Sequence, residues 1–258
     1  MVNLRENNRP ISYLRKVLEG ELGIMTKDAT AGLDNLLMDL KIDKIGIASL
    51  DDWKDTPLWN QTQKLLPGAK SVIVLAMELF QETVAQITSK AVVGDLALRD
   101  LYLANSAVVS GHLDWEGYKM VKRLHARGFK GLLLPADGGP YDGRLLEGPL
   151  SYRHTAEAAG FGIIGWHSLL ITPEYGSRVR LSCILTNAPL VSSDPLKMES
   201  PCLECGGACV KICPAKAIAE PRAGEAYHLD KYACCSYYTA SGMCSECLRV
   251  CPAGKGSS

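Results

Sequence analysis

Cysteine is the residue type in this chain whose number and spacing point most directly to chemistry. The sequence has 258 residues and ten cysteines, nine of which lie between Cys202 and Cys251. A disulfide framework would be spread through the fold that it stabilises, and a reducing compartment would not maintain it. Closely spaced thiolates at one end of a chain are instead typical ligands of soft metals. Two groups, from Cys202 to Pro214 and from Cys244 to Pro252, therefore predict metal centres.

Both groups end in Cys-Pro after three intervening residues. They resemble the run that holds two 4Fe–4S clusters in bacterial ferredoxins, where the cysteine before proline crosses to the other cluster. The resemblance implies two sets of four thiolates. One set is Cys202, Cys205, Cys209 and Cys251; the other is Cys213, Cys244, Cys247 and one of Cys234 or Cys235.

The spacing departs from the ferredoxin run in two places. Three residues rather than two separate Cys205 from Cys209, and Gly206 and Gly207 could absorb the extra length in a looser loop. In the second group, eight or nine residues rather than two separate the outer ligand from Cys244. At these two places the spacing alone does not fix the ligand.

Zinc is the alternative that the same residues leave open. Zinc ribbons also use Cys-x2-Cys pairs, with four thiolates for each ion. Zinc explains neither the two Cys-Pro endings nor the interleaving of eight ligands, so we favour clusters. Cys183 lies apart, in the apolar stretch from Val179 to Leu185, and we expect it to be a buried strand cysteine.

Hydrophobic periodicity predicts the elements that must position these residues. Helical spacing predicts helices over 26–40 and 113–126 and a short helix over 151–159 with Ser151 as its N-cap. Apolar runs predict strands over 44–48, 71–77, 131–134 and 178–187. A Gly/Pro/Asp-rich loop is expected over 135–149, and a polar connection over 188–200. The alternation of helices and strands favours an α/β layered domain.

The glycine pattern argues against a nucleotide-binding fold. Gly160, Gly162 and Gly165 have the spacing of the dinucleotide signature, but they follow a predicted helix rather than joining a strand to a helix. A Walker-type phosphate loop is also missing from the sequence. We therefore do not expect a Rossmann fold.

Composition and charge narrow the class of protein. Lys plus Arg and Asp plus Glu number 28 each, and this balance argues against a protein whose main task is nucleic-acid binding. The apolar runs are far shorter than the roughly 20 residues that span a bilayer. The N-terminus lacks the apolar core of a secretory signal. We therefore expect a cytoplasmic protein with no membrane partner.

Segments over most of the chain resemble the superfamily of epoxyqueuosine reductases and reductive dehalogenases. The similar stretches are 66–76, 153–171, 175–178 and the cysteine groups. Residues 234–239 resemble the family phrase Cys-x-Ser-Tyr-x-Thr, which favours Cys234 over Cys235 as the ligand. The resemblance implies an α/β (α+β) fold, with a nitroreductase-like domain over 1–195 and a two-cluster ferredoxin-like domain over 196–258.

The resemblance also implies a base-off corrinoid (cobalamin), its cobalt close to one cluster and reduced to Co(I). The residues expected to bind it are Gly160, Gly162, Gly165, His167 and Ser168; at the glycines a Cβ would obstruct the approach of the backbone. In keeping with base-off binding, the chain has no Asp-x-His-x-x-Gly loop to supply a cobalt ligand. A loop-capping or solvent-facing role for His167 stays open.

Departures from the family bear on the substrate. The chain ends seven residues after Cys251, without the extension by which epoxyqueuosine reductases contact tRNA, and it has no export signal of the kind found in respiratory dehalogenases. The family phrase Gly-Arg-Asp-Tyr-His survives only in part over 111–115. We expect Asp114 and Tyr118 to be the candidate acids near the substrate. Asp114 could instead be a helix N-cap, and Tyr118 a core residue.

Three functions follow as hypotheses. The first is an iron–sulfur oxidoreductase that uses two 4Fe–4S clusters and a corrinoid for reductive chemistry on a small molecule, with a ferredoxin or flavodoxin as low-potential electron donor. The second is an electron-transfer protein that activates a corrinoid or flavin on a partner. The third, epoxyqueuosine reduction on tRNA, is disfavoured by the zero net charge and the missing extension.

Overall fold

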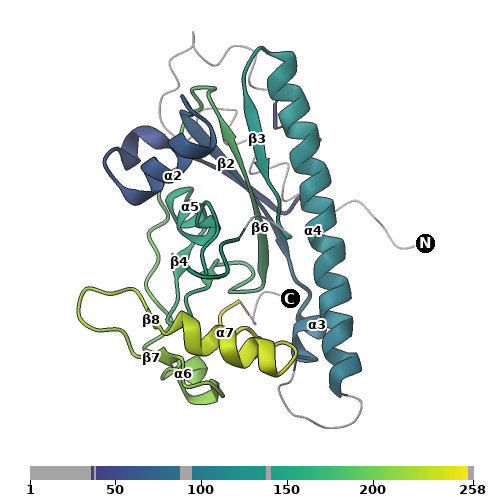
Figure 1. Ribbon diagram of the computed structural model, residues 1–258, viewed down its shortest axis with the longest axis vertical. Coiled ribbons are helices and arrows are strands. Elements are labelled where there is room, and N and C mark those ends of the chain that lie inside the picture. The colour runs from purple at the N-terminus through teal and green to yellow at the C-terminus, as the bar shows by residue number, and fades with distance from the viewer. Residues whose placement is uncertain (1–35, 38, 88–94, 138–140, 255–258) are drawn as a thin grey trace.

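The computed structural model describes residues 36–37, 39–87, 95–137 and 141–254 (Figure 1). At its centre lies a four-stranded antiparallel sheet with the order β1-β2-β6-β3. The strands are β1 (Lys44–Ser49), β2 (Ser71–Glu78), β3 (Gly131–Leu134) and β6 (Val179–Thr186). All four predicted strands are present, and the mixed α and β class is confirmed.

Both faces of the sheet are covered, which explains why β2 is buried over six consecutive residues. Ile73 and Leu75 point toward α3 (Gln81–Ala85) and α4 (Asp95–Ala126), whereas Val72 and Val74 point to the other side. This alternation follows from the two-residue period of a strand. The second face is covered by η1 (Leu50–Trp53), α2 (Pro57–Leu65), α5 (Tyr152–Ala158) and the hairpin of β4 (Ile163–Ile164) and β5 (Leu170–Ile171).

Helix α4 runs along the whole length of the sheet (Figure 1). It was predicted to begin near Leu113, but it already begins at Asp95. Leu98, Leu101 and Val108 are exposed and hide the helical spacing of the buried residues in its first half. Asp114 therefore lies in the middle of a helix, and its alternative role as an N-cap is wrong. The helix ends at Ala126, and Gly128, the glycine expected to stop it, follows with a φ of +78°.

The remaining predicted elements are largely as expected. Ser151 is the N-cap residue of α5, and Gly160 follows the helix with a positive φ of 75°. The described parts of 135–149 and all of 188–200 have no helix or strand. The predicted helix over 26–40 lies almost entirely outside the described residues. Among the described residues, no helix is both long and apolar enough to cross a membrane.

The cysteine-bearing segment is built from short elements. They are α6 (Ala208–Ile212), β7 (Ile218–Ala219), β8 (His228–Leu229), α7 (Lys231–Ala240) and α8 (Glu246–Val250). Met243 and Leu248 from this segment belong to the same hydrophobic cluster as Ile73 and Leu113. Because apolar contacts cross residue 195, the division into domains at that point stays a prediction.

Candidate functional site

The first set of predicted ligands gathers around α6 and the end of α8. Cys202 and Cys205 lie in the turns before α6, Cys209 lies within it, and Cys251 follows α8, which packs on α6. Burial, together with the nearby thiols of Cys202, Cys205 and Cys251, raises the pKa of Cys209 to about 11. The structure thus brings these four thiols together. Gly206 and Gly207 both have positive φ, which accommodates the extra residue in the loop.

The second set gathers between α7 and α8. Burial, together with the neighbouring thiols of Cys244 and Cys234, raises the pKa of Cys247 to about 12. Burial also raises the pKa of Cys234, and the nearby thiols of Cys213 and Cys244 raise it further. The structure therefore brings together Cys213, Cys234, Cys244 and Cys247. The Cys209 thiol of the first set also raises the pKa of Cys247, so the two groups lie within electrostatic range of each other.

Cys235 has different surroundings from its neighbour Cys234. Burial raises the pKa of the Tyr141 hydroxyl, and the nearby Cys235 thiol raises this pKa further. Cys235 therefore lies near Tyr141. Cys183 is fully buried on β6, as predicted.

The donor set fits two iron–sulfur clusters. All ten thiols are free, and each group offers four soft donors, the set that one 4Fe–4S cube requires. The backbone N–H of Ala217 donates to Cys213 Sγ over 3.3 Å, a contact of the kind that stabilises a thiolate ligand. Apolar side chains such as Ile218 and Val210 surround the thiols. Within the described ranges, no three His, Cys, Asp or Glu side chains converge closely enough to hold a single metal ion.

A cavity of about 590 Å³ lies between α5, β6 and the cysteine-bearing segment. Such a volume is in the range of small-molecule sites. Its wall combines basic and aromatic side chains with a few apolar ones. The polar and aromatic members include Gln61, Tyr152, Arg153, His154, Arg180 and Tyr227.

Hydrogen bonds hold several of these side chains in place. Arg153 Nη2 donates to the Tyr227 hydroxyl over 3.1 Å, and its Nη1 donates to the Ser168 carbonyl and hydroxyl oxygens. The Ser151 hydroxyl lies 2.6 Å from His154 Nδ1, so this N-cap side chain binds an imidazole instead of a backbone N–H. Burial lowers the pKa of His154, and the charge of Arg153 lowers it further. His154 is therefore mostly neutral near pH 7.

The two predicted acids lie in different surroundings. Asp114 Oδ1 accepts a hydrogen bond from the N–H of Ala136, a residue of the cavity wall, and burial raises the pKa of the Asp114 carboxyl. Tyr118 is half exposed and stacks on Trp115, with 5.6 Å between the ring centroids. It does not line the cavity, and its alternative role as a core residue is wrong.

The predicted corrinoid-binding glycines approach the chain itself. A Cβ on Gly162 would lie 1.9 Å from the carbonyl oxygen of Ile171, and one on Gly160 would lie 2.2 Å from that of Asp194. At Gly165 the nearest atoms belong to Ile171 and His167. The absent Cβ atoms thus allow close backbone packing here, and none of the three glycines lines the cavity. Their role in cofactor binding stays a prediction, as does the corrinoid itself.

His167 and Ser168 form the turn between β4 and β5. His167 is only 4% exposed, so a solvent-facing role is wrong, and its Nδ1 accepts a hydrogen bond from the Leu169 N–H over 3.1 Å. This contact within the turn is the loop-capping role that was the alternative for His167. Burial lowers the pKa of His167 to about 4, so the ring is neutral with its proton on Nε2, which has no partner among the described residues. Ser168 is buried with a φ of +61°.

Sequence reasoning missed Tyr152, His154, Arg180 and Tyr227 as residues of the cavity. The Tyr152 hydroxyl donates to the Pro135 carbonyl oxygen over 2.9 Å, and burial raises its pKa, with Asp114 contributing in the same direction. Asp114 and Tyr152 therefore lie near each other at the cavity wall. The family-like stretch over 153–171 could have pointed to this cavity, because its first residues, Arg153 and His154, line the wall.

Comparisons with known proteins agree with the resemblance. No protein-family model matches the chain. The chain is 32% identical over 203 residues to an epoxyqueuosine reductase of Gloeobacter violaceus, covering 78% of this chain and 56% of the relative. It is 28% identical over 214 residues to an epoxyqueuosine reductase of Bacillus cereus, covering 75% and 50%. It is 36% identical over 117 residues to the tetrachloroethene reductive dehalogenase of Sulfurospirillum multivorans, covering 40% and 23%.

Solved structures of both kinds share the fold. A reductive dehalogenase described as catalysing B12-dependent dehalogenation matches with a TM-score of 0.63 at 16% identity, over 90% of this chain and 33% of that one. An epoxyqueuosine reductase in complex with a modified tRNA stem loop matches with a TM-score of 0.56 at 20% identity, over 95% and 67%. The chain spans about half the length, or less, of the curated relatives that it matches.

Proposed function

Because the chain belongs to the superfamily of epoxyqueuosine reductases and reductive dehalogenases, we propose that it is an iron–sulfur oxidoreductase. Two 4Fe–4S clusters would pass electrons to a base-off corrinoid, which performs reductive chemistry on a small molecule. The observation that carries this proposal is the gathering of eight free thiols into two groups of four. Each such group supplies the ligands of one cluster.

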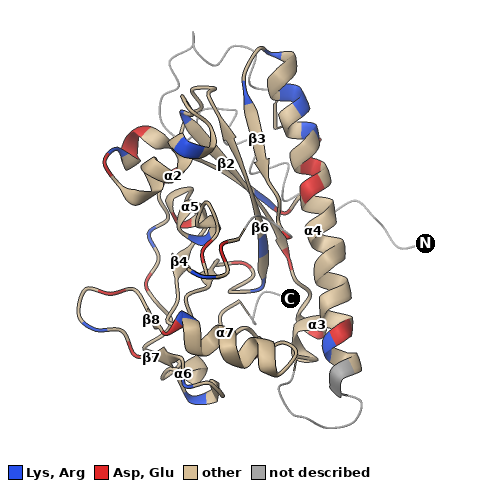
Figure 2. Cartoon of the chain, viewed as in Figure 1, with Lys and Arg blue, Asp and Glu red and all other residues tan. Residues whose placement is uncertain are grey.

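Exposure gives the electron path a direction. In the second group one thiol is exposed (Cys234), two are partly exposed and one is buried (Cys213), whereas in the first group three are buried and only Cys205 is partly exposed. A donor would therefore reach the second cluster first. Lys231 is the only charged residue of α7, the helix that carries Cys234 (Figure 2). A low-potential ferredoxin or flavodoxin would dock on this nearly uncharged surface.

The cavity, whose wall includes Tyr227 of the cysteine-bearing segment, is the proposed place of reduction. When bound, a corrinoid supplies a strongly reducing metal centre, and the protein supplies orientation and protons. Arg153 and Arg180 give the wall positive charge for an anionic substrate group. Asp114 stays a candidate acid, because its raised pKa favours the protonated form, and Tyr152 is a second candidate nearby. The role of Tyr118 as an acid stays a prediction, and this residue does not line the cavity.

Anaerobic purification followed by analysis of iron, sulfide, zinc, cobalt and flavin on one sample tests the proposal. We expect about eight iron and eight sulfide per chain. Adding cobalamin should give one retained corrinoid per chain whose optical spectrum changes on reduction. A colourless protein that contains zinc would refute the proposal. Two clusters without any retained cobalamin would favour the electron-transfer or activator function.

Epoxyqueuosine reduction on tRNA is the second candidate. Two relatives with this name cover three quarters of the chain, and Lys119, Lys122 and Arg123 recur along the second half of α4 (Figure 2). Binding to a tRNA anticodon stem loop should weaken steeply as salt is added, because phosphate contacts release counterions. Binding that is absent at low salt, or insensitive to salt, would dismiss this candidate.

A further inference from the structure

Two buried arginines cross from the sheet-bearing part of the chain to the cysteine-bearing segment. Arg99 lies in the first turns of α4, and Arg178 lies directly before β6. Each is only 5% exposed and donates to backbone carbonyl oxygens of the cysteine-bearing segment. A guanidinium has five N–H groups, and buried donors nearly always have partners. The N–H groups that remain unpaired are therefore informative.

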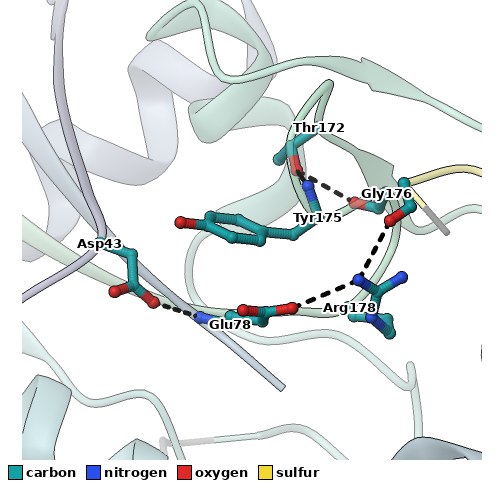
Figure 3. A network of polar contacts seen from close by, with 7 residues as sticks. Asp43, Glu78, Thr172, Tyr175, Gly176 and Arg178 are labelled. Carbon is teal, nitrogen blue, oxygen red and sulfur yellow. Dashed lines mark hydrogen bonds and ion pairs between the residues drawn. The ribbon is translucent and has the colours of Figure 1, made fainter. Parts of the chain in front are cut away.

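Arg178 lies between the end of β2 and the segment that follows Cys251. Its Nη2 donates to Glu78 Oε1 over 3.3 Å and to the Gly254 carbonyl oxygen over 3.2 Å (Figure 3). The backbone N–H of Glu78 in turn donates to Asp43 Oδ2 over 2.7 Å. Nε and Nη1 of Arg178 are buried and have no partner among the described residues. The ion pair with Glu78 thus leaves two donors of the guanidinium unused.

Arg178 contacts the backbone that follows the first group of thiols. Gly254, whose carbonyl oxygen it binds, is three residues after Cys251, a separation of at most about 11 Å in any conformation. A Cβ on Gly176 would lie 1.9 Å from the Ala253 carbonyl oxygen, so the two backbones touch. The hydroxyl of Ser177, the residue before Arg178, is buried and has no hydrogen-bond partner among the described residues.

Arg99 holds a similar position beside the second group. Its Nη1 donates to the carbonyl oxygens of Ser241 and Met243 over 2.8 and 2.9 Å, directly before Cys244 in the sequence. Met243 directly precedes Cys244, so the guanidinium binds the backbone next to this thiol. Its Nε is buried and unpaired among the described residues.

Backbone clamping alone does not account for this arrangement. The bonds to Gly254, Ser241 and Met243 use only one nitrogen of each guanidinium. The other buried N–H groups and the Ser177 hydroxyl belong to residues that touch the backbone before Cys244 and after Cys251, two thiols that, on the proposed function, hold anionic clusters. Thiolate and sulfide sulfurs accept hydrogen bonds, and both these bonds and nearby charge set the potential of a cluster.

We propose that Arg178 and Arg99 are potential-tuning residues, one beside each cluster, whose positive charge and unpaired N–H groups stabilise the reduced form. Reduction adds one electron to a cluster and therefore increases its negative charge. A fixed positive charge nearby raises the reduction potential. This inference rests on the proposed function, since it requires that both clusters are present.

Redox titration of the full-length protein, followed by electron paramagnetic resonance under anaerobic conditions, tests the proposal. We expect R178Q to lower the midpoint potential of one cluster by about 59 mV, a tenfold change in its ratio of reduced to oxidised form. R99Q should lower the other cluster by a similar amount. R178K and R99K retain the charge and should shift the potentials less. K54Q removes an exposed charge next to η1 and should leave both potentials unchanged.

A second measurement does not depend on variants that fold. Protein whose arginine guanidinium nitrogens carry 15N should show a 15N hyperfine coupling to the reduced clusters, and R249K, which replaces the arginine between Cys247 and Cys251, should keep this coupling. Normal iron content with unchanged potentials in both Gln variants, or no arginine coupling in the unmodified protein, would overturn the proposal. Unmodified protein that holds no iron would instead refute the proposed function.

Discussion

Cys234 and Cys235 are adjacent in α7, yet their thiols have different neighbours. Cys234 lies near Cys213 and Cys244, whereas Cys235 lies near Tyr141. We expect C234A to lose one cluster, so that iron falls from about eight to about four atoms per chain. C235A should keep all of its iron, and it serves as the matched control. Iron and sulfide analysis after anaerobic purification checks both, and the reverse result would move the ligand to Cys235.

The buried His167 is expected to make the stability of the fold depend on pH. Its pKa is about 4 in the folded protein, below the ordinary value of 6.5, so the unfolded chain binds the proton more readily. The stability that the neutral ring contributes is fully present above pH 6.5 and is lost as the pH falls toward 4. At pH 5 the loss is about 2 kcal/mol.

Urea unfolding of the unmodified protein and of H167Q at pH 7.5 and pH 5 measures this contribution. Gln can accept the Leu169 N–H through its side-chain oxygen but does not titrate. The free energy of unfolding should therefore fall by about 2 kcal/mol less in H167Q between these two pH values. Equal losses in both proteins would show that His167 is already accessible to protons in the folded state.

The sequence predicts metal ligands better than cavity residues, for a physical reason. A cluster requires one rare residue type at nearly fixed spacing, and much of that spacing is local. The cavity wall combines common types such as Tyr152, His154 and Arg180, which meet only after α5 packs against β6. Charge, hydropathy and periodicity along the sequence do not predict which of these side chains folding brings together.

At the scale of elements, the strands were predictable because β2 and β6 are central and covered on both faces. The apolar run of β2 is therefore continuous, and β6 is buried over its last five residues. Helix α4 was only half predictable, because the buried residues Tyr102 and Val109 each directly follow an exposed apolar residue, Leu101 and Val108. The exposed residues blur the apolar stripe on which the prediction of a helix depends.

Gly162 and Gly111 provide a matched pair of alanine substitutions. At Gly162 a Cβ would meet the Ile171 carbonyl oxygen at 1.9 Å, so G162A must push β5 away from the start of β4. We expect a loss of about 3 kcal/mol in the free energy of unfolding. Gly111 lies exposed on α4 with nothing within 4 Å of a Cβ, and G111A should gain about 1 kcal/mol.

Thermal or urea unfolding of both variants under the same anaerobic conditions measures the two effects. The comparison separates packing from cofactor binding, because the unfolding of protein free of corrinoid does not depend on the cofactor. If G162A were as stable as the unmodified protein and lost only cobalamin binding, the glycine would serve the cofactor, as the sequence prediction had it.

At the scale of the whole molecule, the cysteine-bearing segment and the sheet are joined by buried contacts. Met243 and Leu248 pack in the core that covers one face of the sheet, and Gly176 touches the backbone of Gly254. The short elements of the segment, none longer than the ten residues of α7, bury little apolar surface of their own. The clusters would therefore act as its main internal cross-links.

Removal of the clusters should accordingly loosen the molecule from the C-terminal side. Oxidation with ferricyanide in the presence of a chelator, followed by hydrogen exchange, should abolish protection over 201–254 while β2 and β6 keep most of theirs. Because Met243 and Leu248 then no longer stay packed against α4, the melting temperature of the remaining fold should fall by about 10 °C. Rebuilding the clusters with iron and sulfide should restore both. If the segment kept its protection without iron, its packing on the sheet would be sufficient to fold it, and the thiols would serve electron transfer alone.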